Sequence, residues 1–237
     1  MPTTTSMADA ARWVGAFLQT ADSFYPTGTY AHSFGLEGLL EAGTVTDLAA
    51  LRTFLLDHAL PPLADTDLPL ARLAWEAADT PIDWPRLHHL SHLGAAMRGT
   101  AEVRRACLAI GSQRADLASR LHGGLAAEFN RRATAENWPR PSAIVAAIEG
   151  RTLGAPLEAT LAGIVYAAAA AFASAAVKLL RLGQNAVHTL LADALACAPA
   201  LIARAAQKRI EDLGTFNPWW DIASARHETA NFRLFIS

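Results

Sequence analysis

The stretch Ala21-Asp22-Ser23-Phe24-Tyr25-Pro26-Thr27-Gly28-Thr29-Tyr30-Ala31-His32-Ser33-Phe34-Gly35-Leu36-Glu37 determines how this chain is organised. It places aromatic residues, glycines, a proline and polar side chains within one short span, as expected where a backbone turns. Pro26 fixes its own φ angle and lacks a backbone donor, and Gly28 can adopt a positive φ angle. A turn is therefore predicted here, between a helix over residues 8–20 and a second helix from about residue 32 to 41.

The composition predicts a folded protein with a sizeable core. The chain has 237 residues, of which 52% are hydrophobic and 18% charged, and its formal net charge is −2. Such a sequence is not disordered, and its charge balance gives no footprint for nucleic acid or anionic lipid. Cys107 and Cys197 show neither metal-ligand spacing nor a disulfide framework, which fits a reducing cytosol. The first eleven residues lack a signal-peptide pattern, so a cytoplasmic protein is expected.

Helical periodicity dominates the rest of the sequence. Sustained alternation of apolar and polar residues is missing, so no strand is predicted. We expect an all-α fold, with a single-domain bundle of roughly eight to ten helices over residues 1–215 and an irregular partner-binding tail over residues 216–237. The core helix is predicted from about residue 157 to 182, followed by two further helices over residues 185–197 and 199–213.

One segment of the predicted core helix has the length of a membrane span. Residues 159–177 carry no charged side chain and could cross a bilayer. The segment is mostly alanine, however, with little of the leucine, isoleucine and phenylalanine that drives insertion. A buried central helix is therefore favoured over membrane contact. Its small residues Gly163, Ala167, Ala171 and Ala175 recur every four positions, which would let a neighbouring helix approach closely.

Three histidines fall close together in the pattern His88-His89-x-x-His92. His88 and His92 are one helical turn apart on one face, which is a possible two-histidine metal site. The pattern lacks the glutamate of the His-Glu-x-x-His motif and implies no third ligand. A solvated helix face is the favoured interpretation, and a transient nickel or zinc contact is the alternative.

No residue of the leading stretch completes a catalytic site. Asp22, His32 and Glu37 could form an acid–base set, but no nucleophile accompanies them, because Ser33 lacks the Gly-x-Ser-x-Gly elbow. The sequence also contains no phosphate-binding loop and no dinucleotide fingerprint. The alternative is that Asp22 and Ser33 cap helix ends, while the aromatic residues pack in the core or face a partner.

The tail concentrates aromatic and charged side chains in the last nineteen residues. A solvated, disordered tail should contain few aromatic residues, so these side chains must be buried, either against their own domain or in a partner. Arginine and aromatic residues together are typical of interaction hot spots. We expect a tail that is loosely docked until a partner binds. The residues concerned are Trp219, Trp220, Arg226, His227, Glu228, Phe232, Arg233, Leu234 and Phe235.

Three stretches carry a resemblance to a known family. Residues 22–37 contain the pattern Asp-Ser-x-x-Pro-x-Gly-x-Tyr-x-His-Ser-x-Gly-Leu-Glu, which resembles the N-terminal signature of urease accessory proteins of the UreF type. Leu182-Gly183-Gln184 follows a long alanine-rich helix, as in that family. Residues 221–229, together with Arg233-Leu234-Phe235 and Ser237, resemble the family's C-terminal signature. The three stretches lie in the family's order and span nearly the whole chain.

The chain also departs from the family pattern at a few positions. The family often has a second glycine where Thr29 stands, and Gln-Tyr-Ser where Ala230-Asn231-Phe232 stand. It often has a basic residue in place of Ile236. These departures fall in the segments that the resemblance assigns to partner contacts.

The resemblance implies a chaperone rather than an enzyme. Proteins of this type are all-α, cytoplasmic and often dimeric, and they have no catalysis and no cofactor of their own. They join a UreD/UreH-type protein and the GTPase UreG in an assembly that inserts nickel into apo-urease. A homodimer, protein–protein interaction during urease maturation and some form of nickel cation binding are therefore implied, with GTP chemistry in the partner. Neither nucleic acid nor a membrane is an expected partner.

The expected partner-binding residues combine the matched positions with the aromatic turn. No catalytic residue and no metal ligand is predicted. The set consists of Asp22, Tyr25, Pro26, Gly28, Tyr30, His32, Ser33, Glu37, Gln184, Arg226, His227, Glu228, Arg233, Leu234 and Phe235.

Two other hypotheses remain from the sequence. An α-helical metal-dependent enzyme would need Glu-x-x-His pairs that project inward from facing helices, and no glutamate here has a histidine three positions on. A membrane-associated helical protein is the other alternative, and fractionation without detergent tests it.

Overall fold

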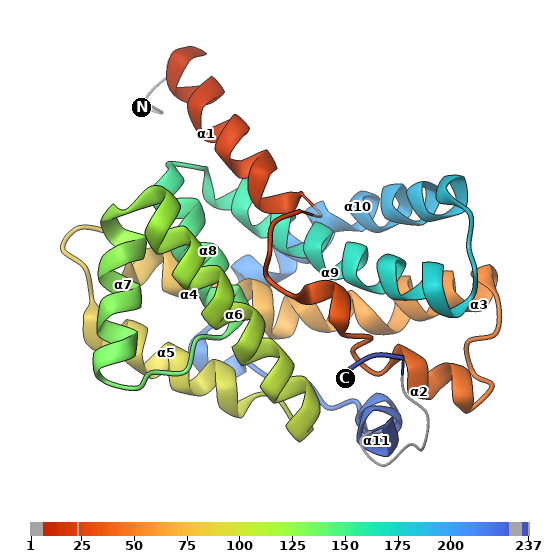
Figure 1. Ribbon diagram of the computed structural model, residues 1–237. Coiled ribbons are helices and arrows are strands. Elements are labelled where there is room, and N and C mark those ends of the chain that lie inside the picture. The colour runs from red at the N-terminus through yellow and green to blue at the C-terminus, as the bar shows by residue number, and fades with distance from the viewer. Residues whose placement is uncertain (1–6, 23, 228–233, 237) are drawn as a thin grey trace.

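The structure, a computed structural model, describes residues 7–22, 24–227 and 234–236. No strand occurs in these ranges, and the helices pack into one domain, which confirms the predicted all-α fold (Figure 1). The α-helices are α1 (Met7–Ala21), α2 (Leu36–Glu41), α3 (Leu48–Thr53), α4 (Asp67–Ala77), α5 (Trp84–Ala96), α6 (Ala101–His122), α7 (Gly124–Ala135), α8 (Ser142–Leu153), α9 (Leu157–Leu179), α10 (Gln184–Ala206) and α11 (Pro218–His227). Short turns of other helix types lie at η1 (Thr29–Ala31), η2 (Phe54–Ala59), η3 (Pro61–Asp65) and η4 (Ile210–Asp212).

Helix α8 forms the centre of the core. Every residue from Ala143 to Gly150 is buried, because α1, α4, α6, α7 and α9 all pack against it. A helix that is covered on all sides must be apolar all round, and this one is, apart from Glu149. Gly150 allows α9 to approach closely, since a Cβ atom there would lie 2.3 Å from Thr160 Oγ1.

The predicted core helix, α9, is long but only partly enclosed. It packs against α2, α4, α8 and α10, while Val177 near its end is 40% exposed. Its small-residue face does receive a neighbour: a Cβ atom at Gly163 would lie 2.6 Å from Phe17 Cζ of α1. The helix ends at Leu179 rather than at residue 182. The core is therefore shared between α8 and α9.

The prediction of two helices over residues 185–197 and 199–213 is wrong. Helix α10 runs from Gln184 to Ala206 with Pro199 inside it. An internal proline removes one backbone hydrogen bond and costs about 3 kcal/mol. Ala198, Leu201 and Ala205 are buried on either side of it, so packing offsets that cost.

Helices α9 and α10 are both long and apolar enough to cross a membrane. This is weak evidence, because the core helix of a soluble protein passes the same test. Of the apolar window of α9, 56% is buried inside the fold, as expected for a helix that packs on protein.

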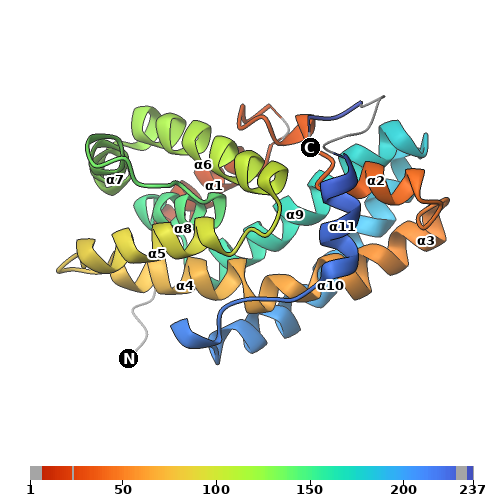
Figure 2. The ribbon, with the colours of Figure 1, turned by 90° about the horizontal axis from the view of Figure 1, so that it is seen from below.

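The tail contains a regular helix that packs on the domain. Figures 1 and 2 both place α11 beside α2. Asn217 Oδ1 accepts the Trp220 backbone N–H at 3.3 Å, and Pro218 stands at the first helical position, which suits proline. The segment that was predicted to be irregular thus includes one helix, and its residues Ala223 and Phe235 join the core cluster.

Candidate functional site

The leading stretch is anchored to the core through a buried carboxylate. The Tyr25 hydroxyl donates to Glu149, whose side chain is fully buried, and Arg114 Nε donates to the other oxygen at 2.5 Å. His122 Nε2 lies 3.5 Å from the same carboxylate. Burial and the neighbouring Glu149 carboxylate raise the pKa of Tyr25, so the phenol stays a proton donor. The network fixes the stretch relative to α6 and α8.

The turn predicted at Gly28 is confirmed. Its φ angle is +80°, and a Cβ atom there would lie 2.9 Å from Gln113 Oε1. The turn leads into η1 and leaves two aromatic side chains in solvent, because Phe24 is 91% and Tyr30 is 64% exposed. The stretch therefore buries Tyr25 while it presents Phe24 and Tyr30.

Helix α11 is held against the end of this stretch by Trp220. The indole Nε1 donates to the Phe34 backbone oxygen at 2.9 Å. The Trp220 ring also packs at 5.5 Å from Phe54 and 5.8 Å from Phe172, between ring centroids. Gly35 leaves room for this contact, since it has φ +86° and a Cβ atom would lie 2.9 Å from Trp220 Nε1.

A second attachment fixes residues 234–236. Both carboxylate oxygens of Glu37 accept backbone N–H groups, from Leu234 at 2.8 Å and from Phe235 at 3.2 Å. The Ile236 N–H donates to the Ala31 oxygen at 2.9 Å. The described part of the tail is thus packed on the leading stretch rather than loosely docked. We call these two joined segments, residues 22–37 and 216–236 as far as the structure describes them, the recognition surface.

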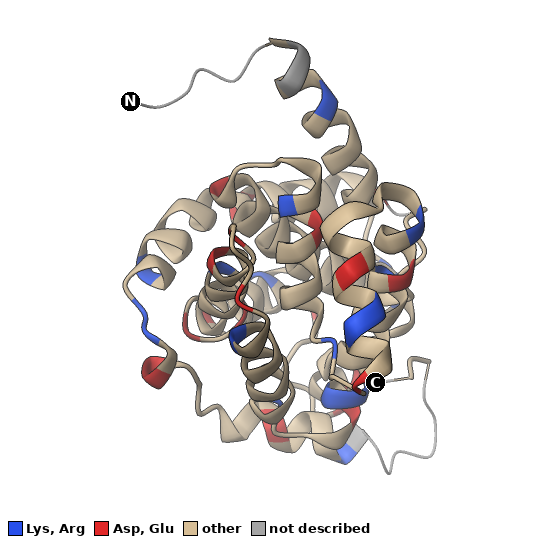
Figure 3. Cartoon of the chain, turned by 90° about the vertical axis from the view of Figure 1, so that its left-hand side faces the viewer, with Lys and Arg blue, Asp and Glu red and all other residues tan. Residues whose placement is uncertain are grey.

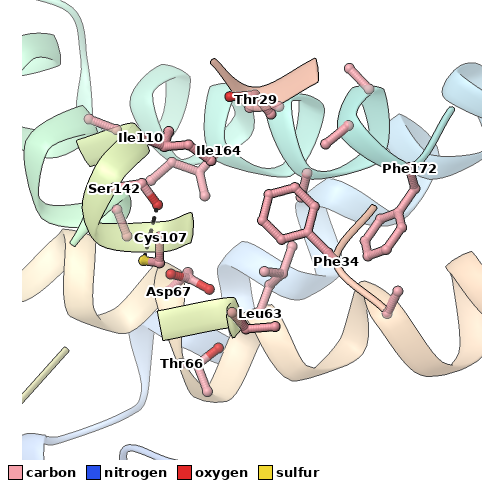
Figure 4. A pocket seen from close by; sticks show the side chains of 18 of the residues that line it. Thr29, Phe34, Leu63, Thr66, Asp67, Cys107, Ile110, Ser142, Ile164 and Phe172 are labelled. Carbon is pink, nitrogen blue, oxygen red and sulfur yellow. Dashed lines mark hydrogen bonds between the residues drawn. The ribbon is translucent and has the colours of Figure 1, made fainter. Parts of the chain in front are cut away.

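A cavity of about 420 Å³ lies beneath the recognition surface. Figure 4 shows Asp67, Cys107 and Ser142 at one end of it, and the rings of Phe34 and Phe172 at the other. The Cys107 Sγ and Ser142 Oγ atoms are 3.6 Å apart, and Asp67 forms an ion pair with Arg98. Residues of the leading stretch and of α11 also line the cavity, so its shape depends on how these two segments are held.

The predicted site residues divide into exposed and buried sets. The exposed ones are Asp22, Pro26, Tyr30, Gln184, Arg226 and Leu234. The buried ones are Tyr25, His32, Ser33, Glu37 and Phe235, and Gly28 is partly buried at the turn. The buried side chains hold the exposed ones in place. Gln184 is the first residue of α10 and follows the short connection from α9, which ends at Leu179. His227 ends α11, its side chain is not described, and Glu228 and Arg233 lie outside the described residues.

The acid–base set and the predicted helix caps have other roles. Asp22 is exposed and accepts the Phe24 backbone N–H at 2.8 Å, in a turn that follows α1. The Ser33 hydroxyl accepts the Glu37 N–H at 3.5 Å, at the first turn of α2. Burial lowers the pKa of His32, against the opposing effect of the Glu102 carboxylate, and Glu37 is engaged with the tail backbone. These geometries serve structure rather than proton transfer.

Sequence reasoning missed the residues that hold the recognition surface from below. Glu149 interrupts an otherwise apolar helical run, and a lone carboxylate in such a run signals a buried partner. Lys178 was missed as well. Its ammonium group lies 5.0 Å from the centroid of the Phe235 ring and donates to the backbone oxygen of Tyr30 at 3.4 Å. No sequence signal near Lys178 indicated that contact.

The recognition surface exposes large apolar side chains on both of its segments. Figure 3 shows acidic and basic positions interspersed along the helices, so charge of one sign does not dominate. Exposed aromatic and aliphatic groups beside an arginine fit the anatomy of a protein interface. The exposed apolar residues are Phe24, Tyr30, Phe216, Trp219, Ile222, Leu234 and Ile236.

Comparison with known proteins gives one family throughout. The family model described as UreF matches residues 45–195. A protein of Paenarthrobacter aurescens named "Urease accessory protein UreF" is 30% identical over 94% of this chain and 97% of its own length. A protein of the same name from Rhodopseudomonas palustris (strain BisB5) is 34% identical over 90% of this chain and 86% of its own length. Another, from Granulibacter bethesdensis, is 32% identical over 99% of this chain and 97% of its own length.

Proposed function

Because the chain belongs to the UreF family of urease accessory proteins, we propose that it is a scaffold that joins a UreD/UreH-type protein to a UreG-type GTPase. In this proposal the assembly inserts nickel into apo-urease, and the chain regulates the GTP-dependent step without hydrolysing GTP itself. Its relatives are named as accessory proteins of urease, and the prediction that the chain is not an enzyme is confirmed on that ground.

The observation that carries the proposal is the recognition surface. Ile222 is 52% exposed on the outer face of α11, and Trp219 is 40% exposed although its ring also contacts His58 at 5.4 Å between centroids. Trp220 and Ala223 on the inner face fix the helix to the domain. A docked helix that exposes apolar side chains can bind a partner at low entropic cost, because its side chains are already in position. We propose that this face binds the UreD/UreH-type protein.

The substitution Ile222→Asp tests the assignment. It places a charge on the outer face without touching the core, and we expect co-purification with a tagged UreD/UreH-type protein to fall more than tenfold, equivalent to about 1.4 kcal/mol or more. Leu121→Asp is the matched control, because Leu121 is 49% exposed at the end of α6. Normal binding by Ile222→Asp, or equal loss in both variants, would contradict the proposal.

Arg226 follows Ile222 by one helical turn on α11 and is exposed. A planar guanidinium can make multidentate bonds that lysine cannot reproduce. Removal of such a group from an interface costs about 2–5 kcal/mol, largely from the partner group left unpaired. We expect Arg226→Ala to weaken assembly strongly and Arg226→Lys not to restore it. Normal assembly with Arg226→Lys would mean that the partner requires only a positive charge at this position.

The GTPase step belongs to the partner in this proposal. The purified chain should not hydrolyse GTP, and its addition to a UreG-type protein with the UreD/UreH-type partner should change the GTP hydrolysis rate of that protein. Turnover of GTP by the isolated chain would refute this division of labour.

We also propose a cytoplasmic homodimer, alone or within the assembly. Helix α10 supports it, because only 22% of its apolar window is buried and Leu195 on it is 40% exposed. Light scattering of the chain with and without the UreD/UreH-type partner measures the mass. A monomer under both conditions would contradict the dimer, and recovery only in detergent would contradict a cytoplasmic location.

The cavity supports a role in nickel transfer. It brings a carboxylate and a thiol, from Asp67 and Cys107, to one end of the cavity beneath the recognition surface (Figure 4). We propose that nickel passes here as cargo. Cys107→Ser should then slow nickel-dependent urease activation in the complete assembly while the assembly still forms. Unchanged activation would exclude the thiol from the path.

A further inference from the structure

Helix α5 carries a pair of exposed histidines that the recognition surface does not use. His88 and His92 lie one turn apart, and their ring centroids are 4.6 Å from each other. Both side chains are exposed. We infer that His88 and His92 together bind one divalent transition-metal ion, such as Cu²⁺, Ni²⁺ or Zn²⁺, on the surface of α5.

The ring separation fits chelation. With metal–nitrogen bonds of about 2.1 Å and a distance of about 1.1 Å from nitrogen to ring centre, two imidazoles bound at about 90° have centroids about 4.5 Å apart. The observed separation of 4.6 Å is close to this value. Bond angles near 90° belong to octahedral and square-planar ions, among them Ni²⁺ and Cu²⁺. Binding requires rotation about the side-chain bonds so that one nitrogen of each ring points at the ion.

The helix beneath the pair is held firmly. Leu87, Leu90 and Ser91 on its inner face are fully buried. The Asp83 side chain accepts the Arg86 N–H at 2.9 Å and so caps the helix. A metal site keeps its affinity when its ligands sit on rigid elements, because little order must be imposed on binding. The pair therefore needs only side-chain adjustment.

An aromatic contact fixes one of the two ligands. The Trp138 ring lies 5.1 Å from His88, between centroids, and its indole Nε1 donates to Glu136 Oε2 at 3.0 Å. This limits the rotation of His88 and places a natural fluorophore beside the site. A bound Cu²⁺ ion quenches a nearby indole, so Trp138 can report occupancy.

The site has two protein ligands, and water completes the coordination. No group of three or more His, Cys, Asp or Glu side chains that could hold a metal occurs in the part of the chain that the structure describes. An open, two-ligand site exchanges its ion readily and follows the order Cu²⁺ above Ni²⁺ and Zn²⁺ in affinity. Figures 1 and 2 place α5 and α11 in different parts of the molecule. The inference therefore stands independently of the proposed function.

Titration of the full chain, free of any histidine tag, with CuCl₂, NiCl₂ or ZnCl₂ alone tests the inference by calorimetry. One ion should bind per chain at this site. We expect His88→Ala and His92→Ala each to weaken binding by about tenfold or more, because each removes one of two ligands. His89→Ala is the matched control on the same helix and should bind as the wild-type chain does.

Fluorescence ties the bound ion to its place. Cu²⁺ should quench part of the tryptophan emission, and Trp138→Phe should remove that part while calorimetry still detects one bound ion per chain. Circular dichroism melts without metal show whether each variant is folded. Full affinity in the His88→Ala and His92→Ala variants, or a loss in His89→Ala as large as theirs, would overturn the assignment.

Discussion

The carboxylate of Glu37 is the clearest single point at which to test how the tail is held. It accepts the backbone N–H groups of Leu234 at 2.8 Å and Phe235 at 3.2 Å. Hydrogen bonds to a charged acceptor contribute about 1.5–3 kcal/mol each. Glu37→Gln keeps the shape but leaves one acceptor oxygen, and it turns an amide N–H₂ toward the second backbone donor.

The expected cost of Glu37→Gln is about 2–3 kcal/mol, from one lost charged bond and one unpaired N–H. At 1.4 kcal/mol per tenfold, the undocked population of residues 234–236 should rise about thirtyfold to a hundredfold. The global melting temperature should fall less than this cost implies, because the tail segment can open locally while the domain stays folded.

Amide hydrogen exchange at Leu234 and Phe235 measures the effect. Both amides should exchange faster in Glu37→Gln, by the factor given above. Glu41→Gln is the control, because Glu41 is exposed at the end of the same helix, and it should leave both amides unchanged. Unaltered exchange in Glu37→Gln would refute the assigned role, and equal acceleration across the whole domain would show that Glu37 supports the core instead.

Three further predictions concern the same region. Gly38→Ala should destabilise the fold by about 1–3 kcal/mol, because its Cβ atom would lie 2.5 Å from the Ala223 backbone oxygen, and this clash outweighs the helix preference of alanine. Gly15→Ala should stabilise the fold, because the space around Gly15 is open. Urea unfolding measures both changes. Tyr25→Phe removes the hydroxyl that donates to the buried Glu149 carboxylate, which keeps Arg114 as a donor, and should cost about 1–3 kcal/mol in the same assay. Burial lowers the pKa of His32 below its ordinary 6.5 in the folded chain. As the pH drops through about 6.5, the unfolded chain binds a proton at this histidine before the folded chain does, so the free energy of unfolding should fall. In thermal melts between pH 7.5 and 5.5, His32→Asn should make that fall smaller.

Much of the fold follows from local signals in the sequence. The turn at Gly28 and the absence of strands in the described residues both agree with prediction. These features depend on short-range chemistry, which a sequence displays directly. The break expected at Pro199 failed because the buried residues around it stabilise the helix through tertiary contacts, and such contacts outweigh local propensity.

The supports of the candidate site could not be predicted from motifs. The contact of Tyr25 with Glu149 spans 124 positions, and that of Trp220 with Phe34 spans 186. Nothing in the local sequence pairs such residues, because only the packing of α8 and α11 brings them together. The burial of Glu37 was equally invisible, since its partners are backbone N–H groups, which every residue but proline possesses.

Helix α11 bears on the two alternatives that the sequence left open for the tail aromatics, burial against the domain and contact with a partner. Trp220, Ala223 and Ser224 face the domain, and Ile222 faces solvent. Trp219 is 40% exposed, and its ring also contacts His58 and Phe54. A helix that only docked on its own domain would be polar on its outer face. A helix that only served a partner would not bury Trp220 among Phe54 and Phe172. The inner face thus supports the core, while binding of a partner by the outer face stays a prediction. Deletion of the whole tail would remove both faces, whereas substitutions on the outer face alone test recognition without loss of the core contacts.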